Sequence, residues 1–193
     1  MLVLASASPR RLELLHNAGI EFIVHPSNVP EDILPNEAPQ TYVRRLAHAK
    51  ALAVFEQRPQ EQVLGADTIV VVDSSILGKP TDAADALRML RLLSGREHNV
   101  ITGVCLLTPI SGELPHTDVR HETTRVTMKL LTDAEIQAYV AHGEPMDKAG
   151  AYAIQGLASR WIPKIDGCYF NVVGLPVPLV YAMFRVAASL QRV

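Results

Sequence analysis

The chain has 193 residues, of which 48% are hydrophobic and 20% are charged, so it is long enough for a well-buried core. This composition is typical of a globular protein and excludes collagen-like, low-complexity and disulfide-rich classes. The formal net charge of -2 and the pI of about 6.4 provide no broad basic surface. Nucleic-acid binding through bulk electrostatics is therefore not expected, and any anion site should be local.

Two cysteines, Cys105 and Cys168, lie far apart and have no CxxC or zinc-type spacing. This usage favours a reducing compartment. The N-terminus lacks the pattern of a signal peptide, and no run approaches the roughly 20 apolar residues of a membrane span. We therefore expect a cytoplasmic protein that binds neither nucleic acid nor a membrane.

The first elements are a strand over residues 2–5 and a helix that begins at Ser8 and Pro9. Ser8 is a favoured N-cap residue, and proline is tolerated at the first helical position because its missing N–H would have no partner there. Gly19 supplies the helix stop.

Two arginines, Arg10 and Arg11, fall in the first turn of this helix. The macrodipole is positive at a helix N-terminus, so cations are unfavourable there unless an anion is bound. Backbone N–H groups and guanidinium groups together favour phosphate, which makes this turn a candidate phosphate site. In the alternative reading, one arginine pairs with Glu13 or a distant carboxylate and the other is solvated.

The following elements alternate between strand and helix as far as residue 95. They are a strand over 20–25, a polar loop over 26–39, a helix over 42–53, a buried strand within 63–73, a turn at 73–75, a short strand or loop over 76–80, and a helix capped by Thr81 that ends at 94–95.

The second half is richer in strands. We expect strands over 99–108 and 116–130 joined by a turn at 109–113, a helix from the capping box at 132–135 to Gly143, short strands around 151–156, 160–165 and 169–173, and a closing amphipathic helix over 176–190. Because strands and helices alternate early but two strands run together in the middle, the sequence predicts an α/β fold with a mixed central sheet flanked by helices.

Asp67 is a carboxylate inside the apolar run VLGADTIVVVD. A buried unpaired charge is costly, so Asp67 needs a metal, a cation or a raised pKa. Gly65 permits close backbone approach and Thr68 adds a hydroxyl donor, which together suit an acid that holds Mg²⁺ or orients a water. The alternative is an aspartate at a strand end that hydrogen-bonds to backbone.

Three lysines, Lys50, Lys79 and Lys148, are considered together with Asp67 and the arginine pair. Lys50 follows Val43 and Leu46 at helical spacing and should point toward the apolar face of its helix. The segment around Lys79 lacks the glycine and hydroxyl residues of a Walker A loop, and GxGxxG, HExxH and GxSxG are also absent from the sequence. For each lysine taken alone, a surface position with a partly buried stem is the alternative.

Six motifs occur in one order along the chain: LASASPRR, LGADTIV, LGKP, LRLLSGREHNVITGV, MDKAGAYAIQG and IDGCYFNVVGLP. In content, order and spacing they resemble the Maf family of nucleoside triphosphate pyrophosphatases, over about residues 2–180. The resemblance implies a single Maf-like domain over residues 1–193 with the inosine-triphosphatase-like (Maf/Ham1) fold, and a nucleotide cleft between two lobes.

The resemblance also implies roles for individual residues. Asp67 matches the family's catalytic base or metal ligand, and Glu31 in VPED falls near its acidic loop position, where Asp32 is the alternative second ligand of a divalent cation, Mg²⁺ or Mn²⁺. Residues that match the substrate-binding and specificity positions are Arg10, Thr68, Gln155, Ser8, Arg11, Lys50, Lys79 and Lys148.

Gln155 indicates the expected substrate. Its amide offers a donor and an acceptor, which complement the O4 acceptor and N3–H donor of uracil or thymine, whereas a carboxylate would suit guanine donors. The amide thus favours pyrimidine nucleotides. Together with it, the resemblance implies hydrolysis of dTTP and UTP, or modified pyrimidine nucleotides, to the monophosphate and pyrophosphate by metal-assisted attack of water at the α-phosphate. Gln155 as a structural turn residue is the alternative.

Two further expectations concern the whole protein. A homodimer is compatible with the resemblance. The alternative function is a nucleotide-binding regulator of cell division or septum formation without turnover, although binding alone has no use for a carboxylate directed at the α-phosphate.

Overall fold

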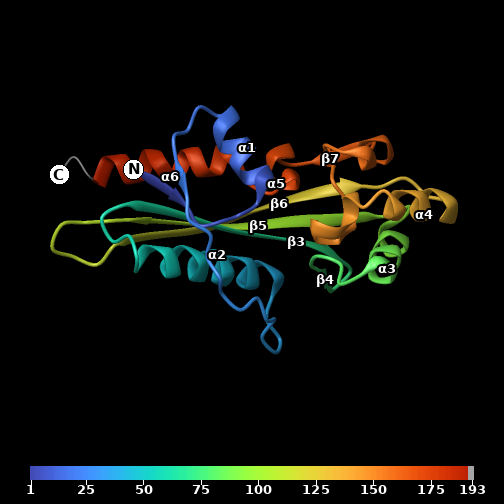
Figure 1. Cartoon of the computed structure of the whole chain (residues 1–193), viewed down its shortest axis with the longest axis horizontal. Coiled ribbons are helices and arrows are strands. Elements are labelled where there is room, and N and C mark those ends of the chain that lie inside the picture. Colours follow the sequence, from blue (N-terminus) through green and yellow to red (C-terminus); the bar gives the residue numbers. More distant parts are fainter. Residues whose placement is uncertain (191–193) are drawn as a thin grey trace. The chain divides into compact units, whose positions relative to one another are not determined.

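The computed structural model describes residues 1–190 (Figure 1), which divide into two compact units. Unit 1 comprises residues 1–67, 102–122 and the chain from 174 onward, and unit 2 comprises residues 68–101 and 123–173. Three long strands contribute residues to both units: β3 (Gln62–Val72), β5 (Glu97–Thr108) and β6 (His116–Thr127). The sheet runs in the order β2 (Ile23–Val24), β1 (Leu2–Leu4), β3, β5, β6 and β7 (Lys164–Asp166), with β4 (Ser75–Leu77) paired to β3.

Unit 1 combines parallel strands with three helices. Its further elements are β1 (Leu2–Leu4), α1 (Pro9–Asn17), β2 (Ile23–Val24), α2 (Pro39–Phe55) and α6 (Val177–Leu190). Strand β1 pairs in parallel with both β2 and β3, and Leu4 lies opposite Val24 on one side and Leu64 on the other. Helix α1 ends as predicted, because Gly19 adopts a φ of 68° and donates its N–H to the His16 carbonyl at 2.9 Å.

The strands of unit 1 bury opposite faces against different helices, because successive side chains of a strand alternate in direction. One face packs against α1 and α6 through a core of Leu2, Leu4, Leu15, Leu64, Ala66, Val104, Leu106, Leu175, Val180, Met183 and Ala187. The other face packs against α2 through Val3, Ala5, Ala47, Ala51, Val54, Phe55, Val63, Cys105 and Leu107. Figure 1 shows α2 on one side of these strands and α1 with α6 on the other.

Two glycines let α2 lie close to the sheet. A Cβ added to Gly65 would stand 2.2 Å from the Ala47 carbonyl oxygen, and one added to Gly103 would stand 2.2 Å from the Val43 carbonyl oxygen. Both obstacles are helix backbone, which cannot turn aside as a flexible side chain could. Gly65 does permit a close backbone approach, as expected, and the backbone that approaches is that of α2.

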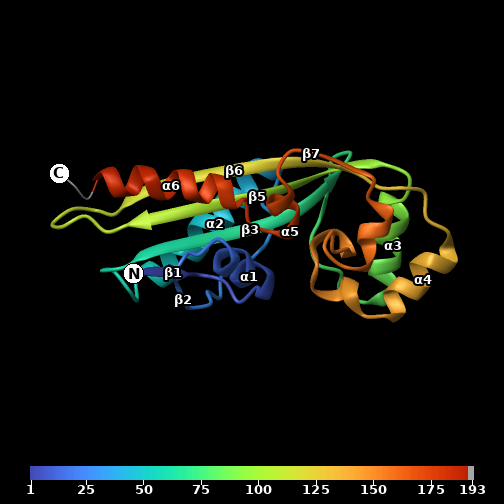
Figure 2. The ribbon, with the colours of Figure 1, turned by 90° about the horizontal axis from the view of Figure 1, so that it is seen from above.

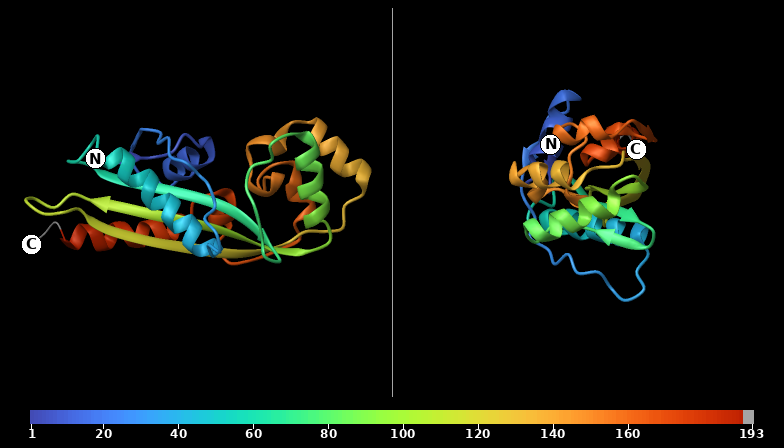
Figure 3. Two further views of the ribbon diagram at one scale, coloured as in Figure 1. Left: turned by 90° about the horizontal axis from the view of Figure 1, so that it is seen from below. Right: turned by 90° about the vertical axis from the view of Figure 1, so that its right-hand side faces the viewer.

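Unit 2 is formed by the other ends of the long strands together with short elements. These are β4 (Ser75–Leu77), α3 (Ala83–Leu93), α4 (Asp133–Ala141), η1 (Glu144–Asp147), η2 (Ala149–Ala151), η3 (Leu157–Trp161), β7 (Lys164–Asp166) and α5 (Tyr169–Val173). Strand β4 pairs antiparallel with β3, and β7 pairs antiparallel with β6. Helix α3 contacts α4 and the η1 and η2 turns. Figures 2 and 3 show this grouping of α3, α4 and the segment after α4.

The mixed sheet is confirmed by the parallel and antiparallel pairs, and the predicted capping box is present at Thr132 and Glu135. The cap of α3 was predicted wrongly, since Asp82, and not Thr81, accepts the Asp85 N–H at 2.8 Å. The apolar run 169–173 forms the short helix α5, and residues 151–156 form 3₁₀ and turn structure in place of the predicted strand. Short apolar runs fit strand and helix equally well, so periodicity could not decide these cases.

Two other strands differ in extent from the sequence prediction. The strand predicted over 20–25 is limited to β2, and the one around 160–165 is limited to β7. The closing helix agrees closely, beginning at Val177. Within residues 1–190, no helix is both long enough and apolar enough to cross a membrane.

Candidate active site

Asp67 and Lys50 form a buried ion pair in unit 1. Asp67 occupies the alternating position of β3 that follows Val63 and Gly65, so it belongs to the face covered by α2. Lys50 lies on the buried stripe of α2, and its Nζ contacts Asp67 Oδ1 at 2.7 Å. The two side chains are 11% and 10% exposed. The predicted inward orientation of Lys50 is confirmed, and it supplies the cation that a buried Asp67 requires.

Glu31 joins this pair from the loop that precedes α2. Its Oε1 contacts Lys50 Nζ at 2.6 Å, and its side chain is 50% exposed. Of the two acidic candidates in VPED, Glu31 therefore reaches the cluster, whereas Asp32 accepts a hydrogen bond from Arg45 through its main-chain oxygen. Asp67, Lys50 and Glu31 are called the carboxylate–lysine cluster below.

Tyr42 was not singled out from the sequence, although it fixes part of this cluster. It lies on the buried stripe of α2 and donates its hydroxyl to the Glu31 carbonyl oxygen at 2.7 Å. Burial, and then the negative charges of Asp67 and Glu31, raise the pKa of Tyr42 to about 12. The available signal was its position eight residues before Lys50 on the same helical face.

The cluster has the donor set of a small divalent cation. One oxygen of Asp67 and one of Glu31 converge on the same point, the Lys50 ammonium nitrogen. Carboxylate oxygens suit Mg²⁺ and Mn²⁺, and Mg²⁺ commonly takes one or two carboxylates and completes its shell with water and substrate phosphates. Within residues 1–190 no group of three or more His, Cys, Asp or Glu is placed to hold a metal ion. A cation held by these two carboxylates alone would take its other ligands from water and substrate.

Hydrogen bonds from its guanidinium hold Arg11 next to Asp67. Its Nε donates to the Gly174 carbonyl oxygen at 2.9 Å, and its Nη1 donates to Ser6 Oγ at 3.1 Å and to the Ala66 carbonyl oxygen at 2.9 Å. Burial lowers the pKa of Arg11, the Asp67 charge opposes this, and the Arg10 charge adds to it. The Arg11 guanidinium is therefore fixed against the backbone of Ala66, the residue that precedes Asp67.

The neighbouring residues of α1 lie where the sequence predicted. Ser8 is the N-cap, with extended backbone at φ -66° and ψ 115°, and Pro9 is the first helical residue. The Ser8 N–H donates to Ser6 Oγ at 3.2 Å. Arg10 is half-buried in the first turn. Ser8, Arg10, Arg11, Glu31, Lys50 and Asp67 thus belong to one unit.

The other four candidates, Thr68, Lys79, Lys148 and Gln155, belong to unit 2. The Gly150 N–H donates to the Gly78 carbonyl oxygen at 3.0 Å, which ties the segment of Lys79 to that of Lys148. Lys148 Nζ donates to the Glu144 carbonyl oxygen at 2.9 Å and pairs with Asp147. Thr68 is half-buried and follows Asp67 along β3.

Gln155 is exposed in a tight turn. The Gly156 N–H donates to the Ala153 carbonyl oxygen at 3.1 Å, which places Gln155 at the third position of the turn. The preceding residues 151–154 are buried, and Ala151 has a φ of 60°, a left-handed conformation that is uncommon for alanine. The turn therefore presents the Gln155 amide to solvent from a well-packed base.

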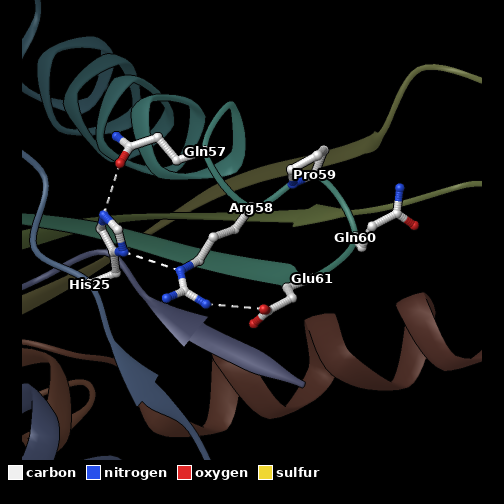
Figure 4. Close-up of a pocket in the computed structure, with 6 residues that line it drawn as sticks. All are labelled: His25, Gln57, Arg58, Pro59, Gln60 and Glu61. Carbon is white, nitrogen blue, oxygen red and sulfur yellow. Dashed lines mark hydrogen bonds and ion pairs between the residues drawn. The ribbon is translucent and has the colours of Figure 1, made fainter.

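A separate polar hollow in unit 1 contains none of these candidates. It is lined by His25, Gln57, Arg58, Pro59, Gln60 and Glu61 (Figure 4). Arg58 Nε donates to His25 Nδ1 at 3.1 Å, so the ring proton is on Nε2, which faces Gln57 Oε1 at 3.1 Å. Because it contains none of the residues that match the family motifs, the hollow is a weaker candidate than the carboxylate–lysine cluster.

The fold and the cluster define an α/β protein with a local site of buried carboxylate and fixed cations. The Maf-like protein family model matches residues 1–187, and the chain belongs to this family.

Relatives in other bacteria match nearly the whole chain. A dTTP/UTP pyrophosphatase of Koribacter versatilis is 55% identical over 98% of this chain and 95% of its own length. A dTTP/UTP pyrophosphatase of Geobacter metallireducens is 52% identical over 98% of this chain and 97% of its own length. Among solved structures, a nucleoside-triphosphatase / dITP/XTP pyrophosphatase from Mycobacterium abscessus aligns with a TM-score of 0.43 and 16% identity over 66% of this chain and 73% of that chain, a likeness too weak for further conclusions.

Proposed function

We propose that this protein hydrolyses dTTP and UTP between the α- and β-phosphates and releases the nucleoside monophosphate and pyrophosphate. The observation that carries the proposal is the carboxylate–lysine cluster, in which a buried acid is held at a fixed position by a lysine. Relatives more than 50% identical over 98% of the chain bear the name dTTP/UTP pyrophosphatase, which agrees with this reaction.

In this proposal Asp67 takes the proton of the attacking water. The water oxygen forms a bond to the α-phosphorus, the bond from this phosphorus to the bridging oxygen breaks, and pyrophosphate leaves with that electron pair. The 2.7 Å bond to Lys50 orients the Asp67 carboxylate before substrate arrives, so little reorganisation is needed during the reaction. Arg11, fixed by its bonds to Ala66 and Gly174, adds positive charge against the phosphates.

We propose Asp67 and Glu31 as the ligands of Mg²⁺ or Mn²⁺. When bound, the cation would neutralise phosphate charge and make a coordinated water more acidic. Because Lys50 contacts both carboxylates, the cation and the ammonium would compete for them. Titration of the substrate-free protein with Mn²⁺, followed by calorimetry, tests this: Asp67→Asn and Glu31→Gln should each weaken binding at least tenfold. Unchanged affinity in both variants would remove these residues as ligands.

Substrate choice is assigned to the exposed Gln155, with Arg10 and Thr68 as further contributors. The donor and acceptor of the Gln155 amide complement the O4 and N3–H of uracil and thymine. The remaining candidates, Ser8, Lys79 and Lys148, are assigned to the phosphates, for which hydroxyl and ammonium donors are suited.

A nucleotide panel scored for monophosphate and pyrophosphate tests the proposal. The wild-type protein should turn over dTTP and UTP faster than GTP and 7-methyl-GTP, and Gln155→Glu should shift this preference toward the guanine nucleotides. Gln137→Glu is the matched control, since Gln137 is exposed on α4 and undergoes the same chemical change. An unchanged pyrimidine preference in Gln155→Glu would refute the role of the amide.

The alternative, a nucleotide-binding regulator without turnover, predicts a different result in the same assay. It requires tight UTP binding with no pyrophosphate release at any Mg²⁺ or Mn²⁺ concentration. The buried position of Asp67 beside Lys50 favours the enzyme, because nucleotide binding alone would gain nothing from an acid placed there.

A further inference from the structure

The turn that presents Gln155 is anchored on both sides by one pair of side chains. The Ala153 N–H, two residues before Gln155, donates to the Tyr139 hydroxyl oxygen at 3.2 Å. The Leu157 N–H, two residues after it, donates to the Glu144 carboxylate at 3.1 Å and 3.2 Å to the two oxygens. The Tyr139 hydroxyl in turn donates to Glu144 Oε1 at 2.7 Å. A single continuous path of hydrogen bonds therefore joins the two flanks of the turn.

The Glu144 carboxylate also lies directly against the turn backbone. A Cβ added to Gly156 would stand 2.3 Å from Glu144 Oε1 and 2.6 Å from its Cδ. The turn can take this position beside the carboxylate because residue 156 has no side chain.

Tyr139, which links Ala153 to Glu144, is held rigidly by its surroundings. The residue is 1% exposed, and its ring packs edge to face on Trp161 with centroids 5.3 Å apart. Burial first, and then the hydrogen bond to Glu144, raise the pKa of Tyr139, so the hydroxyl remains a donor at neutral pH.

Glu144 also links the turn to a second candidate ligand. Its main-chain oxygen accepts a hydrogen bond from Lys148 Nζ at 2.9 Å, while its side chain holds Leu157 and Tyr139. Glu144 therefore contacts both Lys148, which is proposed to bind the phosphates, and the turn of Gln155, which is proposed to bind the nucleobase.

We propose that Glu144 and Tyr139 are positioning residues for nucleobase selectivity, which fix the turn of Gln155 in register with Lys148. Neither residue is assigned a contact with the nucleotide. The inference rests on the proposed function, because it specifies how the structure supports the selectivity assigned to Gln155.

The test combines kinetics with a double-mutant cycle. Glu144→Ala should raise the KM for UTP about tenfold with kcat changed less than threefold, because it removes the hydrogen bonds from Leu157 and Tyr139 to the carboxylate that hold the turn. It should also reduce the preference for UTP over GTP by about tenfold. Glu144→Gln should restore most of both losses, since its amide oxygen can accept from Tyr139 and Leu157. Glu97→Gln, at an exposed position of β5, is the matched control.

The cycle separates positioning from general destabilisation. If Glu144 acts through Gln155, Glu144→Ala should cause no further loss of selectivity in a Gln155→Ala background. A full additional tenfold loss in that background would overturn the inference. Tyr139→Phe keeps the buried ring and should raise the KM several-fold with little change in melting temperature, which guards against misfolding of Glu144→Ala.

Hydrogen exchange distinguishes failure of this inference from failure of the proposed function. In Tyr139→Phe the amides of Ala153 and Leu157 should exchange faster than in the wild type, while those of α3 should not change. If the wild type hydrolyses no nucleotide but this exchange pattern holds, the function is wrong and the anchoring is right. Unchanged exchange together with unchanged KM and selectivity would overturn the positioning role itself.

Discussion

Replacing Lys50 with methionine should strongly destabilise unit 1, because it leaves Asp67 buried without its cation. Methionine has a similar length and keeps the apolar stem packed on α2, so the change removes mainly the charge. Both side chains of the pair are about one tenth exposed. Breaking such a pair from one side costs about 3–5 kcal/mol. The contact with Glu31 adds less than about 1 kcal/mol, since Glu31 is half exposed.

We expect a loss near the lower end, about 3 kcal/mol, because the Arg11 charge also acts on Asp67. For a chain of this length that loss corresponds to a fall in melting temperature of roughly 6–12 °C. Urea unfolding followed by circular dichroism measures it. Lys79→Met is the matched control, since Lys79 is exposed and its loss should change stability by less than about 0.5 kcal/mol.

The double variant Lys50→Met with Asp67→Asn tests the cause. Since it removes both charges, it should be less destabilised than the sum of the single variants by about 1–3 kcal/mol. A Lys50→Met protein within 0.5 kcal/mol of the wild type, or strict additivity in the cycle, would refute the reasoning that the ion pair is buried and coupled.

Three further predictions concern packing, acid stability and capping. Gly65→Ala should lower the free energy of unfolding by about 3 kcal/mol, because its Cβ would stand 2.2 Å from the Ala47 carbonyl oxygen, whereas Gly78→Ala, with open space at that position, should be nearly neutral in the same urea titration. Burial lowers the pKa of His98 from 6.5 to about 4, so between these values the unfolded chain binds a proton that the folded chain does not. Protonation of His98 in the unfolded chain should therefore lower the free energy of unfolding by about 2 kcal/mol between pH 8 and pH 5. The His98→Gln variant should lose about 2 kcal/mol less free energy of unfolding than the wild type over that range. Asp82→Ala should cost about 1 kcal/mol through loss of the α3 N-cap, and an unchanged melting temperature would contradict that assignment.

Local signals in the sequence were sufficient to predict the helix starts, where a few neighbouring residues determine the structure. Ser8 and Pro9 start α1, and Thr132 with Glu135 forms the capping box of α4, because each depends on residues within one turn. The ion pair of Lys50 with Asp67 was not predicted, but local signals did predict that both residues are buried. Helical period places Lys50 on the buried stripe of α2, and the buried strand places Asp67 among apolar neighbours.

Contacts between distant segments could not be read from the sequence. Arg11 bonds to Gly174, 163 residues away, and no local pattern marks that partner. The position of Glu31 depends on an irregular loop whose path is set by Tyr42 and Lys50. The contact of Glu144 with Leu157 likewise depends on how the turn of Gln155 folds back. The single-domain assignment, the cytoplasmic location, the homodimer and the site roles remain predictions.

Hydrolysis of UTP in water enriched in ¹⁸O tests the central claim most directly, with products analysed by mass spectrometry. Attack of water at the α-phosphorus predicts one ¹⁸O atom in UMP and none in the released pyrophosphate. Asp67→Asn should lower the rate at least a hundredfold, as expected for loss of the group that takes the proton. Label in pyrophosphate, or UDP and phosphate as products, would contradict the proposed reaction, and a fully active Asp67→Asn variant would contradict the role of the carboxylate–lysine cluster.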